Sequence, residues 1–201
     1  MRNFERLLGR RFSAQDIRAA DDESVLAAWK GFRQSLEARG KTGSEIECPL
    51  AVGEYLVHVT YDMPRDKATL EAEFSKDGVS DLFTGNYEWQ LHSSCAEINQ
   101  TPGERIMLVK HFGRDTTSEA NIAEMDKLGY RPATHLEAYA FQKANPELQR
   151  RFWIVALGSS AVSDGHRRVA VLFGDSGRRL LGLDCFDLEW YSDLRFLFVR
   201  K

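Results

Sequence analysis

Three short hydrophobic runs dominate the end of the chain, and each is rich in β-branched and aromatic residues. They are Trp153–Leu157, Arg168–Phe173 and Arg195–Arg200, and their composition predicts buried strands. The segment 174–194 between the last two runs is rich in Gly, Ser, Asp and Leu and has a period of neither 2 nor 3.6. We therefore predict an irregular loop in a well-specified frame, which is a common way for a scaffold to display a binding surface.

The first forty residues show helical spacing instead. Apolar residues there fall on one face of a predicted helix, and Gly40 follows the last of them. These residues are Val25, Leu26, Trp29, Phe32 and Leu36. A polar, glycine-containing stretch comes next, so we divide the sequence into an N-terminal helical segment at 1–44 and a second domain at 45–201.

Strand and helix signals alternate after this segment. Tyr55–Tyr61 and Arg105–Phe112 have the β-branched and aromatic content of strands. Lys67–Phe74 predicts a short helix. The stretch Asp77–Gln100 contains many turn residues, and its pattern predicts no definite order of elements.

Two further helices are predicted in the middle of the chain. The first begins at Thr117 or Ser118, whose hydroxyl can cap the first turn, and runs to a glycine stop. We expect Ile122, Met125 and Leu128 to share its buried face.

The second helix opens with Thr134-His-Leu-Glu137, a capping box in which the two end residues satisfy each other's backbone N–H groups. Asn145-Pro146 ends it. Pro132 keeps the preceding residue extended. Two helices among several short strands predict the α+β class.

Composition argues against several classes of function but points to none. The net charge of −3 provides no positive field for nucleic acid. No apolar run approaches the roughly 20 residues that a bilayer span needs, and the start lacks the apolar core of a secretory signal, so we expect no membrane insertion and a cytoplasmic location by default. Three widely spaced cysteines, Cys48, Cys95 and Cys185, favour a reducing compartment, although a Cys48–Cys95 pair remains open.

Other chemistry finds weak support in the sequence. A zinc site could draw on His92 and Cys95 with His58, Asp62 and His111, but no second closely spaced ligand pair accompanies them. A hydrolase could be drawn from four residues at 159–166, namely Ser159, Ser160, Asp164 and His166, yet there is no nucleophile elbow. P-loop and dinucleotide fingerprints are also absent from the sequence. We therefore predict no catalysis, no cofactor and no metal.

A family resemblance enters at the second helix. Gly129–Ala140 resembles the G-x-R-L-P-T-E-x-E-W-x-x-A motif that begins a helix in C-type lectin domains of the formylglycine-generating-enzyme type, with Pro132 and Ala133 in place of the usual Leu-Pro. The last run, Arg195–Arg200, resembles the closing strand of that fold. The only cysteine in this region is Cys185, so the paired-cysteine chemistry of those enzymes does not carry over.

Within that superfamily the protein resembles the variable proteins of diversity-generating retroelements, particularly the archaeal type. The resemblance implies a C-type lectin-like fold, with two helices against short twisted antiparallel strands and an N-terminal helical extension. It also implies that a region at about 155–201 is rewritten by mutagenesis directed at adenines.

Codon arithmetic selects the candidate positions. Randomising the adenines of AAY codons cannot produce Lys, Gln, Glu, Met or Trp, and within 174–194 only Glu189 and Trp190 lie outside the accessible set. We expect those two to be fixed, with Trp190 as a core anchor. The candidate variable, ligand-binding residues are Phe173, Asp175, Ser176, Leu181, Asp184, Cys185, Asp187, Leu188, Tyr191, Ser192, Asp193 and Leu194.

The side chains in this set suit protein recognition. Tyr and Phe supply rigid contact area and Ser, Asp and Gly supply adaptable hydrogen bonding, as in antibody paratopes. Leu181, Cys185, Leu188 and Leu194 would form an exposed apolar patch, although Leu181 and Leu194 could equally pack beneath the loop. We predict a monomer that binds an unknown protein ligand. The alternatives are a small enzyme of the same fold, with its site in the same groove, and an assembly subunit docked through Trp29 and Phe32.

Overall fold

The computed structural model describes residues 53–74, 78–85, 87–175 and 177–201. The predicted helical segment at 1–44, the boundary at 44/45, Cys48 and Ser176 lie outside these residues.

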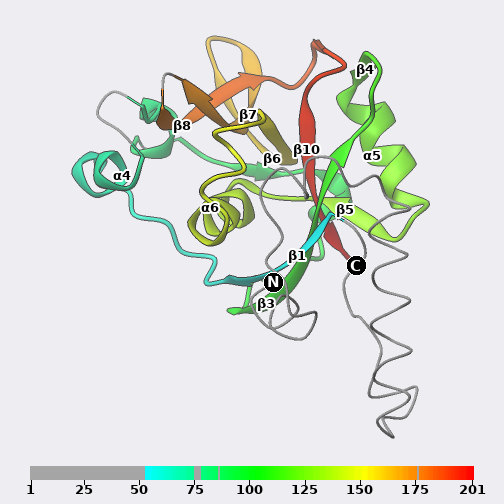
Figure 1. Ribbon diagram of the computed structural model, residues 1–201, viewed down its shortest axis with the longest axis horizontal. Coiled ribbons are helices and arrows are strands. Elements are labelled where there is room, and N and C mark those ends of the chain that lie inside the picture. Colours follow the sequence, from blue (N-terminus) through cyan, green and yellow to red (C-terminus); the bar gives the residue numbers. More distant parts are fainter. Residues whose placement is uncertain (1–52, 75–77, 86, 176) are drawn as a thin grey trace, which may run out of the picture. The chain divides into compact units, whose positions relative to one another are not determined.

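An eight-stranded sheet forms the centre of the described unit (Figure 1). Six strands lie in the order β1-β3-β10-β6-β7-β8, and all neighbours are antiparallel except β10 and β6. Two short strands join from the side, β2 to β6 and β5 to β10. The bounds are β1 Glu54–Val59, β2 Gln90–Leu91, β3 Gly103–His111, β5 Tyr130–Pro132, β6 Ile154–Ser163, β7 His166–Asp175, β8 Arg178–Cys185 and β10 Arg195–Arg200.

A separate two-stranded ribbon pairs β4 (Thr116–Thr117) with β9 (Glu189–Trp190). The described helices are α4 (Lys67–Glu73), α5 (Ser118–Asp126) and α6 (His135–Ala144), with single 3-10 turns at η2 (Asp81–Phe83) and η3 (Ser93–Cys95). Helices and strands occur in one unit, so the predicted α+β class is confirmed.

The central strands are buried on both faces, which explains their continuous apolar runs. On β6, Ile154 and Ala156 belong to a core cluster with Phe141 of α6, whereas Val155 belongs to a second cluster with Met125 of α5. Helices α6 and α5 therefore cover opposite faces of the sheet, and we call these the α6 face and the α5 face.

Most predicted elements are present with small shifts in their ends. β10 has the predicted bounds, and α4, α5 and α6 begin where predicted. β6 and β7 are longer than predicted because they continue into a hairpin, whose turn places Asp164 and Gly165 at φ of 51° and 76°.

Two expectations are wrong. The segment 174–194 is not one irregular loop, because it contains β8 and β9. Leu128 does not share the buried face of α5: the helix ends at Asp126, the chain turns through Gly129 at φ 82°, and Leu128 is 61% exposed.

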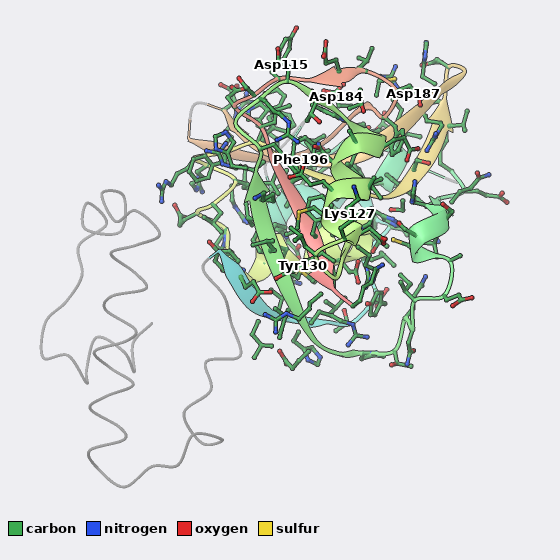
Figure 2. The ribbon with its side chains drawn as sticks, turned by 90° about the vertical axis from the view of Figure 1, so that its right-hand side faces the viewer. Asp115, Lys127, Tyr130, Asp184, Asp187 and Phe196 are labelled. Atoms are coloured by element: carbon green, nitrogen blue, oxygen red, sulfur yellow. The ribbon has the colours of Figure 1, made fainter. Side chains whose placement is uncertain are left out.

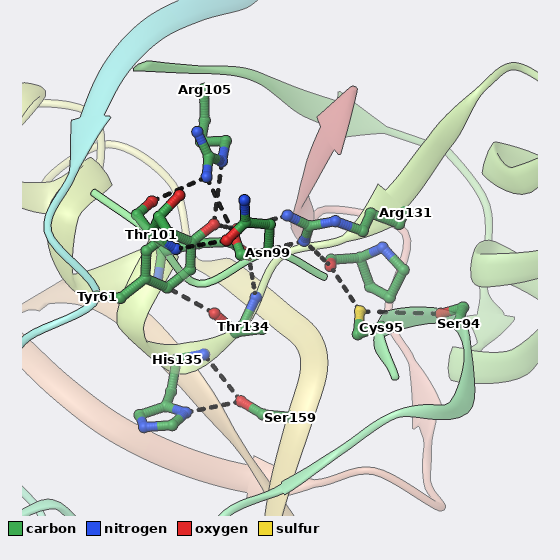
Figure 3. A network of polar contacts seen from close by, with 12 residues as sticks. Tyr61, Ser94, Cys95, Asn99, Thr101, Arg105, Arg131, Thr134, His135 and Ser159 are labelled. Atoms are coloured by element: carbon green, nitrogen blue, oxygen red, sulfur yellow. Dashed lines mark hydrogen bonds and ion pairs between the residues drawn. The ribbon is translucent and has the colours of Figure 1, made fainter. Parts of the chain in front are cut away.

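A buried ion pair fixes the start of α6 (Figure 3). Arg131 donates from both terminal nitrogens to the Glu137 carboxylate, at 2.6 and 2.9 Å. That carboxylate also accepts the Thr134 backbone N–H at 2.8 Å and the Tyr61 hydroxyl at 2.7 Å, and Thr134 caps the Glu137 N–H. Burial alone would raise the pKa of Glu137, but the hydrogen bonds and charge of Arg131 hold it below its usual range. The predicted capping box is therefore confirmed as part of a larger network.

The backbone of β6 passes close to this network at Gly158. A Cβ atom there would lie 2.6 Å from the Pro132 carbonyl oxygen and 2.7 Å from Ala133. Only glycine allows this approach, which brings Ser159 next to the first turn of α6.

Candidate functional site

A hollow of about 840 Å³ lies where the chain leads from the end of β8 towards β10. Three segments line it: the residues just before β6, the end of β3, and the stretch from the end of β8 to the start of β10. The lining residues are His111, Arg151, Phe152, Trp153, Asp184, Leu188, Glu189, Trp190, Tyr191, Asp193, Leu194 and Arg195.

Strand β8 contributes Asp184 to the hollow, and the register of β8 with β7 decides which face this residue lies on. Val171 lies opposite Gly182 and Val169 opposite Asp184, so Gly182 and Asp184 project on the α5 face with these two valines. The ring of Phe173 lies across Gly182, where a Cβ atom would be 2.7 Å from its Cε1.

Aromatic side chains form one wall of the hollow. Trp153 is 46% exposed, although it precedes a buried strand, and its ring lies against Phe173 with centroids 4.6 Å apart. Two guanidinium groups lie over the ring of Phe152, with Arg195 4.7 Å and Arg151 5.0 Å from its centroid. We call Arg151, Phe152, Trp153 and Arg195 the constant wall, because all four lie outside the predicted variable set.

A second part of the lining comes from predicted variable residues, and we call it the loop wall. These residues are Asp184, Leu188, Tyr191, Asp193 and Leu194. Leu188 is 56% and Tyr191 75% exposed. Figure 2, which faces α5, shows Asp184 at the same end of the unit as Asp115 and Asp187.

The backbone beneath the loop wall is tied to the core. Trp190 is buried and donates from Nε1 to the Ser118 hydroxyl at 2.7 Å, as expected for a core anchor. The Ser192 N–H donates to Asp115 at 2.9 Å, and His111 Nε2 lies 2.7 Å from the Ser192 carbonyl oxygen. Because a carbonyl only accepts, this histidine nitrogen carries the proton. The exposed side chains therefore stand on a fixed backbone, which lowers the entropy cost of binding.

The structure separates the twelve candidate residues into groups. Five form the loop wall. Two adjoin the hollow, Phe173 beneath Trp153 and Ser192 through its backbone. Asp175 and Asp187 are exposed and form ion pairs with Arg178 and Arg167, at 2.7 and 3.5 Å. Ser176 lies outside the described residues.

The predicted exposed apolar patch is wrong for Cys185, and for Leu181 the alternative of packing in the interior is the one observed. Leu181 is 0% and Cys185 6% exposed, and Leu181 belongs to the core on the α6 face. In a strand, residues 181 and 185 face away from 182 and 184, so the assumption of a loop concealed this difference. Leu194 is half-buried against the core on the α5 face, and Leu188 alone of the four is exposed.

The constant wall was missed by sequence reasoning. The sequence pattern places Trp153 in a buried strand, but β6 begins one residue later. The available signal was the Arg151-Phe-Trp153 tripeptide itself, because arginine and tryptophan are enriched among the residues that dominate binding at interfaces.

The residues considered for other chemistry are not assembled into a site. Within the described part of the chain, no group of three or more His, Cys, Asp or Glu side chains could hold a metal ion. His58 pairs with Glu104, and the Cys95 thiol donates to the Pro132 carbonyl. Cys95 and Cys185 are free and buried.

Of the hydrolase candidates, Ser159 meets a histidine that was not among them. Its Oγ lies 2.8 Å from Nδ1 of His135 and also accepts the His135 backbone N–H at 2.8 Å. Ser159 is only 1% exposed, and burial lowers the pKa of His135 to about 3. A buried serine beside such a weak base does not form an accessible nucleophile.

Comparison of the sequence and structure with protein-family models, with curated proteins and with solved structures gave no match. None of the described helices has the length and hydropathy that crossing a membrane requires.

Proposed function

We propose that the protein binds a protein ligand in this hollow, and that the loop wall is diversified by a retroelement. The observation that carries this proposal is that lining and support at the site come from different residues. Five candidate variable side chains line one hollow, while the backbone beneath them is held by buried anchors such as Trp190. The exposed side chains among them, Leu188 and Tyr191, can change without disturbing the core.

The proposed fold is a C-type lectin-like domain of the formylglycine-generating-enzyme type. Its support comes from the start of α6. Gly129, Arg131, Thr134 and Glu137 match the resembling motif, and three of these four build the buried network described above. Gly129 supplies the positive φ that ends the α5 turn. The motif positions are therefore the ones with a clear structural task.

The chemistry of the hollow supports protein binding over other ligands. Exposed Trp and Tyr with neighbouring Arg are the side chains that contribute most to the stability of protein interfaces. Among the described hollow residues, no nucleophile forms a hydrogen bond with a base, so we propose no catalytic role.

The decisive experiment is to sequence the gene and the few kilobases beyond its stop codon. We expect a near-copy of the codons for residues 155–201, differing at adenines, beside a reverse-transcriptase gene. The differences should fall on loop-wall positions more often than on Leu181 and Cys185, because changes at buried positions cost stability. An intact locus without such a copy would refute the diversification proposal.

Ligand binding can be tested separately with a display library. Randomising the five loop-wall residues should leave most members folded, and selection against an unrelated protein should then yield binders. The matched library randomises five buried residues of the same region: Leu181, Cys185, Phe186, Trp190 and Phe196. If both libraries lose folded members equally, the loop wall is not a replaceable surface.

A further inference from the structure

The hollow has two walls of different charge. The constant wall carries the guanidinium groups of Arg151 and Arg195, whereas the other wall carries Asp184, Glu189 and Asp193, with His111 at the end of β3. Asp184 and Asp193 are among the candidate variable residues, whereas Arg151 and Arg195 are not. Under the proposed function, we therefore expect the diversified versions of the site to share the basic wall.

The two guanidinium groups are held in place by contacts other than ion pairs. Both stack on Phe152, and Arg195 donates to the carbonyl oxygens of Asp193 and Leu194 at 2.7 and 3.4 Å. Within the described residues, neither group forms an ion pair with a carboxylate.

The loss of water around the Arg195 charge is only partly offset by nearby negative charge. Partial burial lowers its pKa, and the Asp193 carboxylate, which acts from beyond ion-pair distance, only partly offsets this effect. A charged group that has lost water gains most from a new partner of opposite charge. The Asp184 carboxylate also lines the hollow, where it accepts the Cys185 N–H at 2.7 Å.

The surroundings of the arginines are apolar and exposed. Trp153 is 46% exposed next to Phe152, and Tyr191, which also lines the hollow, is 75% exposed. A planar guanidinium can bind a carboxylate through two parallel hydrogen bonds, and the flanking rings exclude water from that contact.

Resting on the proposed function, we infer that the constant wall binds a carboxylate which lies beside an apolar or aromatic side chain of the partner protein. The loop wall then selects among partners, while the carboxylate beside an apolar side chain is common to all of them. The shared carboxylate can come from two sources: the side chain of an Asp or Glu residue, or the C-terminus of the partner polypeptide.

The test starts from random peptides displayed and selected against the full-length protein. We expect enrichment of an acidic residue, or of a free C-terminus, next to an aromatic or aliphatic one. The selected peptides are then synthesised in three forms: unchanged, with the acid replaced by its amide, and with an amidated C-terminus. The two replacements identify the source of the carboxylate.

A double-mutant design locates the contact. Replacing the carboxylate should weaken binding to the wild type about tenfold or more, because hydrogen bonds between charged groups are strong. With Arg151→Gln or Arg195→Lys the same replacement should have a smaller effect, below about threefold for Arg151→Gln. Arg150→Gln is the matched control, since Arg150 is the adjacent arginine and does not line the hollow; it should retain the tenfold effect.

The outcomes separate this inference from the function on which it rests. If selected peptides lose affinity with Tyr191→Ala but show no acidic preference, the hollow binds protein and the carboxylate inference is wrong. If no peptide depends on Tyr191 or Leu188, the proposed function is wrong and the inference falls with it. Circular dichroism of each variant shows whether the fold is intact, and the conservative Arg195→Lys change provides a reading if Arg151→Gln fails to fold.

Discussion

The start of α6 and the loop wall differ in how far their polar side chains are buried and hydrogen-bonded. At the start of α6, the Glu137 carboxylate accepts four hydrogen bonds and is fully buried. In the loop wall, Tyr191 projects into solvent while only its backbone environment is fixed. The first region fixes its polar side chains through buried hydrogen bonds, and the second exposes a side chain above a fixed backbone. We therefore expect substitutions in the first region to cost more stability than substitutions in the second.

The largest effect is expected from breaking the buried ion pair. Glu137→Gln removes the charge that compensates Arg131 and should lower the free energy of unfolding by about 3–5 kcal/mol. Urea denaturation measures this loss. The control is Arg114→Gln, whose exposed pair with Glu124 should contribute less than about 1 kcal/mol. Equal effects of both variants would contradict the view that burial makes the Arg131–Glu137 pair important for stability.

Two leucines of the candidate set provide the next comparison. Leu181→Ala should cost about 2–5 kcal/mol because it leaves a cavity in the core, whereas Leu188→Ala should change stability by less than about 0.5 kcal/mol. The midpoints of thermal and urea unfolding report both values. A stable Leu181→Ala protein would mean that β8 does not hold this side chain in the core.

Mild acid should lower the free energy of unfolding through His135, at the start of α6. The pKa of His135 is about 3 in the folded protein and about 6.5 when unfolded, so below pH 6.5 the unfolded protein binds a proton that the folded protein does not. Stability is therefore full above pH 6.5 and should fall by about 2 kcal/mol between pH 7 and pH 5. Urea titrations at the two pH values test this, and His135→Gln should remove most of the difference.

The smallest effect on stability is expected at the centre of the loop wall. Tyr191→Ala should change the free energy of unfolding by less than about 0.5 kcal/mol, because the ring is 75% exposed. The same variant should abolish the binding of hollow-directed peptides. A loss of stability above about 1 kcal/mol would place the ring in the structural core of the loop instead.

Local patterns were sufficient to predict many of the elements. The capping box at Thr134 and Glu137, the caps of α5, and the apolar run of β10 were predictable because each depends on residues close together in the sequence. The positions of Leu128 and Cys185 were not predictable, since each depends on where a neighbouring element ends or on which face a strand presents.

The candidate site shows the same division. Codon accessibility selected five residues that line the hollow, but it could not distinguish Leu181 from Asp184. The distinction is the pairing register of β8 with β7, a long-range property. Trp153 and Arg151 also escaped notice, because their role depends on residues about 40 positions away in the sequence.

The sequence alone determined the α+β class and the helix starts, and it predicted a candidate surface within residues 173–194. These follow from short-range periodicity and from the chemistry of the side chains. Tertiary structure decided which side chains share the hollow, that Arg131 and Tyr61 both bind Glu137, and that His135 lies against Ser159. The physical reason is that exposure, charge pairing and pKa depend on neighbours that only folding brings together.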